Sequence, residues 1–142
     1  LKKIIFLMQK DVVDRIIAKE GNSNNGGLST RIKLLSKVKK ICDIHPSSFK
    51  PSPKVYSSLV SFTPLSLSSR LDIETEKTIE NLLKVTFNAR RKKLRNTLSS
   101  VFSKENISNL EKQSEINFNL RPQDISVEKW IKLAKLCITI NN

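Results

Sequence analysis

The chain has 142 residues, of which 38% are hydrophobic, and its 26 Lys and Arg against 13 Asp and Glu give a formal net charge of +13. So large a positive charge predicts a polyanionic partner, most often nucleic acid, with an acidic membrane surface as the main alternative. Because no apolar run approaches the length that crosses a bilayer and no signal-peptide pattern opens the chain, we expect no membrane partner and a cytoplasmic location.

The residues up to about Thr63 are predicted to form the edge of a sheet with its helices. Val12, Val13 and Ile16 have helical spacing and define one face of the first helix. Segment 21–27 carries glycines and asparagines that tolerate positive φ, and it has few apolar groups, so we expect a flexible loop. The expected elements are a strand over 4–8, helices over about 9–19 and from about Ser29, and strands over 41–44 and 55–62.

Three lysines follow the start of the second predicted helix at i, i+4 and i+7. We expect that helix to continue through them, so that they make one cationic stripe on its surface. The stripe consists of Lys33, Lys37 and Lys40. It is a candidate for contact with RNA phosphates, and contacts of this kind do not depend on base sequence.

An aromatic residue stands at the mouth of a stiffened loop before the last predicted strand. Pro51 and Pro53 fix their own φ and bias the residues before them toward extended backbone, so Phe49 is presented at little conformational cost. A rigidly held ring suits stacking on a nucleobase, and Lys50 and Lys54 beside it would hold nearby phosphates. The competing interpretation, which composition alone favours, is an ordinary proline-rich loop before an edge strand.

A polar linker is expected to lead into a block of helices. Acidic residues open the first of these helices, where they favour the positive end of its dipole. Helices are predicted over about 74–87 and 90–102 and after Ser126, and together they would form a small helical domain. The residues expected to be buried on them are Ile79, Leu82, Leu83, Phe87, Leu94, Leu98, Val101, Phe102, Trp130, Leu133, Ala134 and Cys137.

Five cations occupy six consecutive positions at the start of the second of these helices. They are Arg90, Arg91, Lys92, Lys93 and Arg95. Their mutual repulsion destabilises a helix unless negative charge lies nearby, and RNA phosphates would supply that charge. A merely solvated basic face is the usual outcome for such a run, but two basic surfaces in one chain favour phosphate contact.

The cysteines and the single histidine indicate no metal site. Cys42 and Cys137 are far apart in sequence with no C-x-x-C partner, so we expect buried thiols in a reducing compartment rather than a disulfide. His45 has no second histidine and no cluster of carboxylates in the sequence, and it is expected to be a loop residue before Pro46. We assign no catalytic residue to the chain.

Several stretches, in order, resemble one known family, the ribosomal RNA adenine dimethyltransferases. The string Phe-Lys-Pro-Ser-Pro-Lys-Val at 49–55 closely resembles the F-x-P-x-P-K-V segment of that family. Residues 6–16 resemble its strand-to-helix junction, and 27–29 resemble its Gly-x-Leu-Ser turn. Residues 87–98 are similar to its basic Phe-x-x-Arg-Arg-Lys helix, and 121–126 are similar to the turn before its last helix. The resemblance covers nearly the whole chain.

The resemblance implies an α/β fold in which 1–63 form the C-terminal end of a Rossmann-like methyltransferase sheet. It also implies a linker over 64–72 and a small all-helical RNA-binding domain over 73–142. The implied activity is S-adenosylmethionine-dependent N6,N6-dimethylation of adenines in small-subunit rRNA, with that rRNA or a pre-ribosomal particle as partner. On the same ground, Phe49 would stack on the flipped adenine and the helix at 90–95 would dock the enzyme.

Two segments of that family's pattern are absent from this chain. A methyltransferase of this class cradles its cofactor on a glycine-rich turn, because only glycine lets backbone amides approach so closely. Gly21, Gly26 and Gly27 cannot make a G-x-G, and the Asn-Leu-Pro-Tyr segment that holds the target amine in the family is missing. We therefore expect the C-terminal portion of such an enzyme, which by itself binds no cofactor and is inactive. Its N-terminal half would be encoded separately, lost or trimmed.

Two other interpretations stay open. A non-catalytic rRNA-binding or ribosome-assembly factor would use the same basic surfaces without chemistry. A sequence-nonspecific DNA-binding helical module is also consistent with the charge, but it is disfavoured because no helix-turn-helix spacing is evident.

Overall fold

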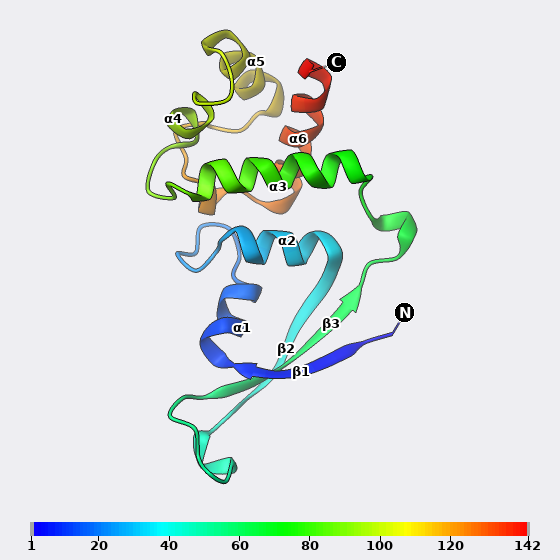
Figure 1. Cartoon of the computed structure of the whole chain (residues 1–142), viewed down its shortest axis with the longest axis vertical. Helices are drawn as coiled ribbons and strands as arrows, with labels where there is room; N and C mark the ends of the chain where they lie inside the picture. The colour runs from blue at the N-terminus through cyan, green and yellow to red at the C-terminus, as the bar shows by residue number, and fades with distance from the viewer. Residues whose placement is uncertain (1, 142) are drawn as a thin grey trace. The chain divides into compact units, whose positions relative to one another are not determined.

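The computed structural model describes residues 2–141, and its elements are shown in Figure 1. The chain divides into two compact units. The sheet unit holds the residues up to Ala18 together with Leu28–Arg70, and the helical unit holds Lys19–Gly27 together with the chain from Leu71 onward. The segment 19–27 therefore belongs to the helical unit although it lies between two parts of the sheet unit in sequence.

The sheet unit is built on three antiparallel strands in the order β1-β3-β2. The central strand pairs with β1 from Ile4 opposite Phe62 to Gln9 opposite Ser57, and with β2 through a register shift between Lys40 and Cys42. The elements of this unit are β1 (Ile4–Gln9), α1 (Lys10–Ile17), α2 (Gly27–Leu35, whose first residue belongs to the helical unit), β2 (Ser36–Ile44) and β3 (Ser57–Pro64). Each strand and helix expected in this part of the sequence has a counterpart, but the boundary between the second helix and the strand after it differs.

The expected helix through Lys40 is wrong, because α2 ends at Leu35 and the strand β2 begins at the next residue. Pairing decides this boundary: Ser36 lies opposite Pro64, and the Leu35 carbonyl accepts a hydrogen bond from the Leu65 N–H at 2.9 Å. Helical spacing of the lysines is a local signal, and pairing with a distant strand overrides it.

A small network of charged side chains joins α1 to β2 and β3. Asp14 accepts hydrogen bonds from Lys10 at 2.7 Å and from Lys40 at 3.4 Å. The Ser58 hydroxyl donates to Asp43 at 2.6 Å, and Lys40 lies 3.3 Å from the same carboxylate. The hydrogen bond from Lys10, followed by that from Lys40, lowers the pKa of Asp14, and the Ser58 hydroxyl is the main cause that lowers the pKa of Asp43. The network therefore favours both ionised carboxylates.

The helical unit packs its helices around one apolar core. The helices are α3 (Ile73–Phe87), α4 (Leu94–Leu98), α5 (Lys104–Ser114) and α6 (Val127–Asn141). Asp72 caps α3 by accepting a hydrogen bond from the Thr75 N–H at 3.1 Å. The largest fully buried side chains of this unit are Trp130, Phe118, Ile79, Leu94, Leu98, Leu110, Ile116, Ile125 and Leu133. The first and last predicted helices and most of their buried residues are confirmed.

The long helix predicted over 90–102 is wrong. Residues 88–91 form turns and 92–93 lead into α4 without helix, α4 is only five residues long, and Val101 is 56% exposed. The reason is that the Leu94 N–H donates to the Leu120 carbonyl at 2.9 Å and the Arg95 N–H donates to the Phe118 carbonyl at 3.0 Å. These amides pair with a distant segment, so no helix runs into them from residue 90. The helix α5 was not predicted.

No helix within residues 2–141 has the length and apolarity that crossing a bilayer requires.

The lowered pKa of Asp14 predicts a pH-dependent contribution to stability. Because the folded-state pKa lies below the unfolded value of about 3.9, the contribution is present above that pH and is lost as the pH falls through the folded-state pKa. We expect Asp14→Asn to lower the thermal midpoint by a few degrees at neutral pH. The difference from the unaltered chain should shrink below about pH 4.

Thermal unfolding followed by circular dichroism between pH 7 and pH 2.5 measures this difference. Asp11→Asn is the matched control, because it removes the same charge from an exposed position on α1. A difference for Asp14→Asn that keeps its size down to the lowest pH would contradict the prediction.

Candidate nucleic-acid interface

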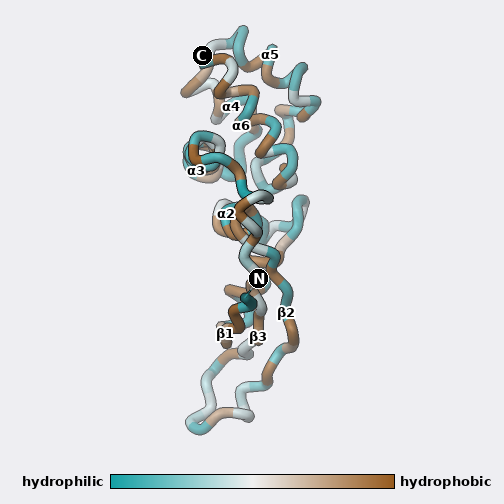
Figure 2. Tube along the Cα trace, turned by 90° about the vertical axis from the view of Figure 1, so that its right-hand side faces the viewer, coloured by the Kyte–Doolittle hydropathy of each residue, from teal (hydrophilic) through white to brown (hydrophobic). Residues whose placement is uncertain are grey.

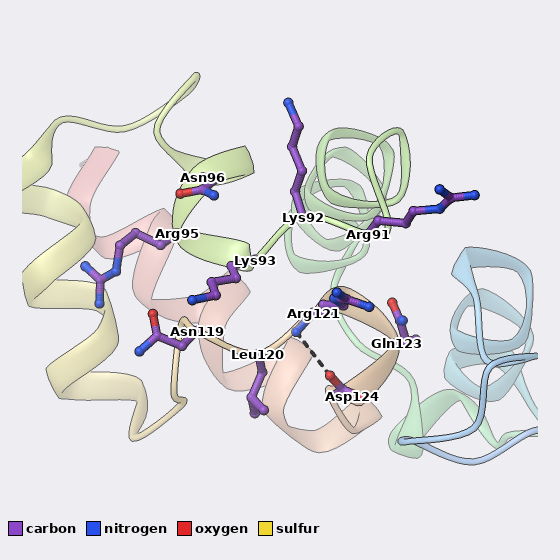
Figure 3. A pocket seen from close by; sticks show the side chains of 10 residues that line it. All are labelled: Arg91, Lys92, Lys93, Arg95, Asn96, Asn119, Leu120, Arg121, Gln123 and Asp124. Carbon is purple, nitrogen blue, oxygen red and sulfur yellow. Dashed lines mark hydrogen bonds between the residues drawn. The ribbon is translucent and has the colours of Figure 1, made fainter.

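The helical unit carries an open hollow of about 850 Å³ that is lined mainly by basic and polar side chains. Five cations and a single carboxylate line it, and Leu120 is its only aliphatic lining residue. Figure 3 shows the lining residues, which are Arg91, Lys92, Lys93, Arg95, Asn96, Asn119, Leu120, Arg121, Gln123 and Asp124. We call this feature the basic hollow.

Two segments distant in sequence form the walls of the basic hollow. One wall is the turn after α3 together with the start of α4, and the other is the loop over 119–124. The backbone bonds from Leu94 and Arg95 to the 118–120 segment hold the walls together. Leu94 is fully buried beneath them, so the neighbouring cations remain on the surface.

A carboxylate of α5 reinforces this junction. Glu111 accepts a hydrogen bond from the Arg95 guanidinium and a second one from the Phe118 N–H at 2.6 Å. The Arg95 side chain is 41% exposed, so it still borders the hollow while its guanidinium pairs with Glu111. Through Glu111, Arg95 thus positions the first wall, which also carries Arg91, Lys92 and Lys93.

The acidic side chain in the lining is hydrogen-bonded to the backbone. Asp124 accepts a hydrogen bond from the Arg121 N–H at 3.1 Å, which leaves the Arg121 guanidinium free of that contact (Figure 3). Arg91, Lys92, Lys93 and Arg121 are all exposed, and Lys92 extends away from Arg121 in the same view. A dense group of cations with one engaged carboxylate attracts an anion of several charges, such as a run of phosphates.

Arg90, the first cation of the basic run, lies outside the hollow's lining. Its guanidinium donates to the Ser23 carbonyl at 2.6 Å and to the Asn25 carbonyl at 3.0 Å, and it lies 5.9 Å from the centroid of the Phe87 ring. The main role visible for Arg90 is to hold segment 19–27 within the helical unit.

Segment 19–27 is therefore ordered, which corrects the expectation of a flexible loop without packing groups. Asn25 is only 3% exposed and donates from Nδ2 to the Gln123 carbonyl at 2.8 Å. The Gly21 N–H donates to the same carbonyl at 3.0 Å, with Gly21 at a φ of +84°. Polar contacts replace the missing apolar ones: the Ser23 and Asn25 carbonyls accept from Arg90, and the Gly21 N–H and Asn25 Nδ2 donate to the Gln123 carbonyl.

The lysine stripe predicted on one helix does not exist, since its members lie on different elements. Lys33 is on α2 and donates to the Ala18 carbonyl, whereas Lys37 and Lys40 are on β2. Being three residues apart on a strand, Lys37 and Lys40 point to opposite faces of the sheet. Lys40 is engaged with Asp14 and Asp43, and Lys37 is exposed.

The proposed aromatic platform lies in the loop between β2 and β3. Phe49 is half-buried, and both Lys50 and Lys54 are exposed. The Phe49 carbonyl accepts a hydrogen bond from the Ser52 hydroxyl at 3.1 Å, and its N–H donates to the Pro46 carbonyl at 3.2 Å. The backbone around the ring is thus held by local bonds.

Among residues 2–141, no group of three or more His, Cys, Asp and Glu side chains could hold a metal ion. His45 accepts from the Ser47 N–H at 3.1 Å and lies edge-on to Tyr56, with ring centroids 5.1 Å apart. Cys137 is buried, which raises the pKa of its thiol to about 11. Cys42 is exposed, so its expected burial is wrong; it sits beside the irregularity where β2 shifts register.

The sequence pattern identified the basic run but not the second wall of the hollow, the loop over 119–124. Asn119 and Arg121 of that wall line the hollow together with Arg91 and Lys93. The turn at 121–126 was recognised in the sequence, but nothing local connects it to residue 91. Only the pairing of the 118–120 segment with the start of α4 brings the two together.

A model of the ribosomal RNA adenine dimethylase family matches residues 1–139. Ribosomal RNA small subunit methyltransferase A of Prochlorococcus marinus strain AS9601 is 63% identical over 139 residues, which are 98% of this chain and 51% of that protein. The protein of the same name from Nostoc sp. strain PCC 7120 is 41% identical and is matched over 48% of its length. The chain therefore spans about half the length of the curated relatives it matches.

Solved structures agree with these sequence matches. A dimethyladenosine transferase from Plasmodium falciparum has a TM-score of 0.73 and 27% identity, covering 94% of this chain and 56% of that one. The 23S rRNA methyltransferase ErmE has a TM-score of 0.68 at 13% identity, covering 95% of this chain and 54% of that one, and at this identity it supports the fold alone. Both neighbours extend well beyond the part that this chain matches.

The contacts of Arg90 predict that it stabilises segment 19–27. In Arg90→Ala we expect the backbone amides of Gly21, Asn24 and Asn25 to exchange with deuterium roughly five- to tenfold faster, because hydrogen bonds of this kind contribute about 1 kcal/mol. Hydrogen exchange read by mass spectrometry or NMR measures this directly. Arg91→Ala removes an equal charge one residue away and should leave these amides unchanged. Equal acceleration in both variants would contradict the assigned role.

Proposed function

The chain belongs to the ribosomal RNA adenine dimethylase family, and on that basis we propose that it is the C-terminal portion of an rRNA (adenine-N6,N6)-dimethyltransferase. The whole enzyme would methylate adenines of small-subunit rRNA with S-adenosylmethionine. The portion described by this chain would supply contacts to the RNA. Its partner would be small-subunit rRNA or a pre-ribosomal particle.

The proposed domain division follows from the family pattern. Residues 1–63 would be the end of the catalytic domain, 64–72 a linker, and 73–142 a helical RNA-binding domain. Support for RNA binding by the last of these comes from the basic hollow, where exposed cations from two segments surround one engaged carboxylate. This clustering is the observation that carries the proposal.

We propose that the described residues do not form a cradle for S-adenosylmethionine. Such a cradle is a G-x-G turn, in which glycine lets backbone amides approach the bound molecule. Gly26 and Gly27 are adjacent and Gly21 lies apart from them, so no two of these glycines make that turn. We therefore assign these residues no step that involves the cofactor, and we propose that the chain binds none by itself.

We propose two kinds of role for these residues: binding RNA phosphates and stacking on one base. Arg91, Lys93 and Arg121 would bind the RNA backbone in the hollow, and these contacts are sequence-independent. In the other unit, Phe49 would stack on a splayed adenine, while Lys50 and Lys54 would hold nearby phosphates. None of these residues needs to act as a base, because positioning of the adenine amine is what this portion would contribute.

The hollow predicts a change in the salt dependence of RNA binding. Each lost phosphate contact lowers the slope of log affinity against log salt by about 0.7–0.9. The triple variant Arg91→Ala/Lys93→Ala/Arg121→Ala should therefore lose about 2 to 3 from that slope, with weaker binding to every RNA sequence tested. Filter binding of a hairpin RNA over a salt range of roughly 50 to 200 mM measures this slope.

A charge-matched control separates the hollow from a general electrostatic effect. Lys77, Lys104 and Lys112 are exposed on α3 and α5 and do not line the hollow. Replacing these three by Ala removes the same total charge and should change the slope much less. If both triple variants lose the same slope, the hollow has no special role.

The assigned role of Phe49 predicts a specific optical signal. A hairpin RNA with two adjacent unpaired adenines, one of them replaced by 2-aminopurine, should lose fluorescence when the chain binds, because the base stacks on an aromatic ring. Phe49→Ala should remove most of this quenching while overall RNA affinity changes little. Phe49→Tyr should retain it. This readout also separates the dimethyltransferase portion from a non-catalytic rRNA-binding factor, which needs no flipped base.

The structural alternative for Phe49 gives a different result. If the ring only anchors its proline-rich loop, Phe49→Ala would destabilise the sheet unit by up to the roughly 3–5 kcal/mol that truncation of a fully buried Phe costs. A large fall in thermal midpoint, together with quenching that Phe49→Ala leaves intact, would rule out the base-stacking role.

A further inference from the structure

The loop that joins β2 to β3 begins and ends with a pair of aromatic rings. His45 follows the last residue of β2, and Tyr56 precedes the first residue of β3. The two rings lie edge-on, with centroids 5.1 Å apart and an angle of 81° between the ring planes. Because the rings are nearly perpendicular, His45 covers at most one face of the Tyr56 ring, and Tyr56 is 46% exposed. Neither ring has a role in the proposed function.

The Tyr56 ring is presented from a fixed backbone. The Tyr56 carbonyl accepts a hydrogen bond from the Lys10 N–H at 3.0 Å, and the next residue, Ser57, pairs with both β1 and β2. The imidazole beside the ring is also held, since His45 Nδ1 accepts from the Ser47 N–H at 3.1 Å. A tyrosine offers a large contact area with only two side-chain torsions, so it loses little entropy on binding. The ring is therefore a preorganised contact surface.

Tyr56 lies at the end of the sheet where ligands bind in open α/β folds. Because β1 and β2 both run antiparallel to β3, they are parallel to each other. Their last residues, Gln9 and Ile44, both lie opposite Ser57, next to Tyr56. In open α/β sheets, ligands bind outside the carboxyl ends of the parallel strands. The loop between β2 and β3, which also carries Phe49, extends beyond this end of β1 (Figure 1).

The composition of this loop suits a nucleic acid strand better than a protein partner. Residues 46–55 comprise three serines, three prolines, two lysines, Phe49 and Val55, with no carboxylate. Most of the loop is pale or teal in Figure 2, so the two rings do not belong to a broad apolar patch. Stacking requires only the π-face of a base, and the exposed Lys50 and Lys54 would balance the phosphates beside it.

We propose that Tyr56, held by His45, is a second stacking platform for an unpaired base of the RNA strand that Phe49 contacts. Phe49 is near this pair of rings, because its N–H donates to the Pro46 carbonyl and a single 3₁₀ turn separates it from His45. At about 2 Å per residue, this turn spans about 8 Å between the two Cα atoms. One strand can therefore place two nearby bases on the loop. The inference rests on the proposed function, because it takes RNA as the ligand.

Tyr56 is the single tyrosine of the chain, which allows a direct test. The full chain is labelled with meta-fluorotyrosine, so that its one fluorine resonance comes from Tyr56. Adding the hairpin RNA with two adjacent unpaired adenines should move this resonance upfield, because a stacked base shields the ring. The same hairpin with both unpaired positions abasic keeps every phosphate. It should bind and leave the resonance nearly unchanged.

Variants separate the two platforms. With 2-aminopurine at one unpaired position at a time, the unaltered chain should quench the fluorescence of both. Tyr56→Ala should remove most of the quenching at one position, and Phe49→Ala should remove it at the other. Tyr56→Phe should retain the quenching, because stacking needs the ring and not the hydroxyl. Val55→Ala is the matched control, since Val55 is the preceding residue, apolar and 47% exposed, and its loss should leave both positions quenched.

The same signal tests the contact of His45 with the ring. His45→Phe keeps an aromatic ring beside Tyr56 and should preserve the quenching that depends on Tyr56, whereas His45→Ala should reduce it. Both variants lose the hydrogen bond from the Ser47 N–H. A difference between them therefore reports the ring contact and not the backbone of the loop.

Three results would overturn the inference: a resonance that moves equally with the abasic RNA, quenching that Tyr56→Ala leaves intact, or an equal loss of quenching in Val55→Ala. A large fall in the thermal midpoint of Tyr56→Ala, with quenching intact, would show that the ring only closes the hairpin. The salt slope of RNA binding tests the proposed function separately. An unaltered slope without a fluorine shift overturns the inference alone, whereas no RNA binding overturns the proposed RNA contact and the inference with it.

Discussion

The carboxylate of Glu111 joins the two segments on which the basic hollow depends. It accepts hydrogen bonds from the Arg95 guanidinium and from the Phe118 N–H, next to the backbone bonds that link the start of α4 to the 118–120 segment. Five cations in six residues repel one another, and a regular helix would keep them close. The structure divides them instead: Arg95 pairs with Glu111, Arg90 binds two loop carbonyls, and the three between them stay exposed in turns. Repulsion is thereby reduced while a positive surface is kept.

The helical unit and the sheet unit bury their apolar side chains to different extents. The helical unit buries a continuous apolar core, with Trp130, Phe118 and Leu133 fully enclosed. Because this core stabilises the unit without contacts from the cations, the cations can cluster on the surface. The sheet unit has its central strand well covered, with Val60 and Ser58 fully buried, but its first strand is left half exposed.

The two kinds of RNA contact proposed for this family member draw on different physics. Phosphate contacts add through charge and counterion release, so they tolerate variation in side-chain position and weaken with salt. Stacking on one ring requires a fixed orientation, and the local hydrogen bonds of Ser52 and Pro46 to the Phe49 backbone are consistent with that need. The long basic side chains lie in turns and loops, whereas the ring is held by a proline-rich loop. Phosphate contacts tolerate variation in side-chain position and stacking requires a fixed ring, so these two settings suit the two proposed contacts.

Local sequence pattern was enough to identify α1, α3 and α6, because their apolar spacing matches their burial, and the apolar run 4–8 was enough to identify β1, although its side chains are about half exposed. The ordered motifs were enough to identify the family. The same pattern failed where a distant segment competes for backbone hydrogen bonds. Lys37 and Lys40 have helical spacing, but pairing with β3 makes them part of a strand. Residues 90–93 lie outside any helix because the amides that follow them bond to Phe118 and Leu120. Arg121 has no local signal that connects it with Arg91, and segment 19–27 is ordered by Arg90 and Gln123, far away in sequence. Charge and motif can be read along the chain, but a hollow with two walls arises only when long-range pairing brings the walls together.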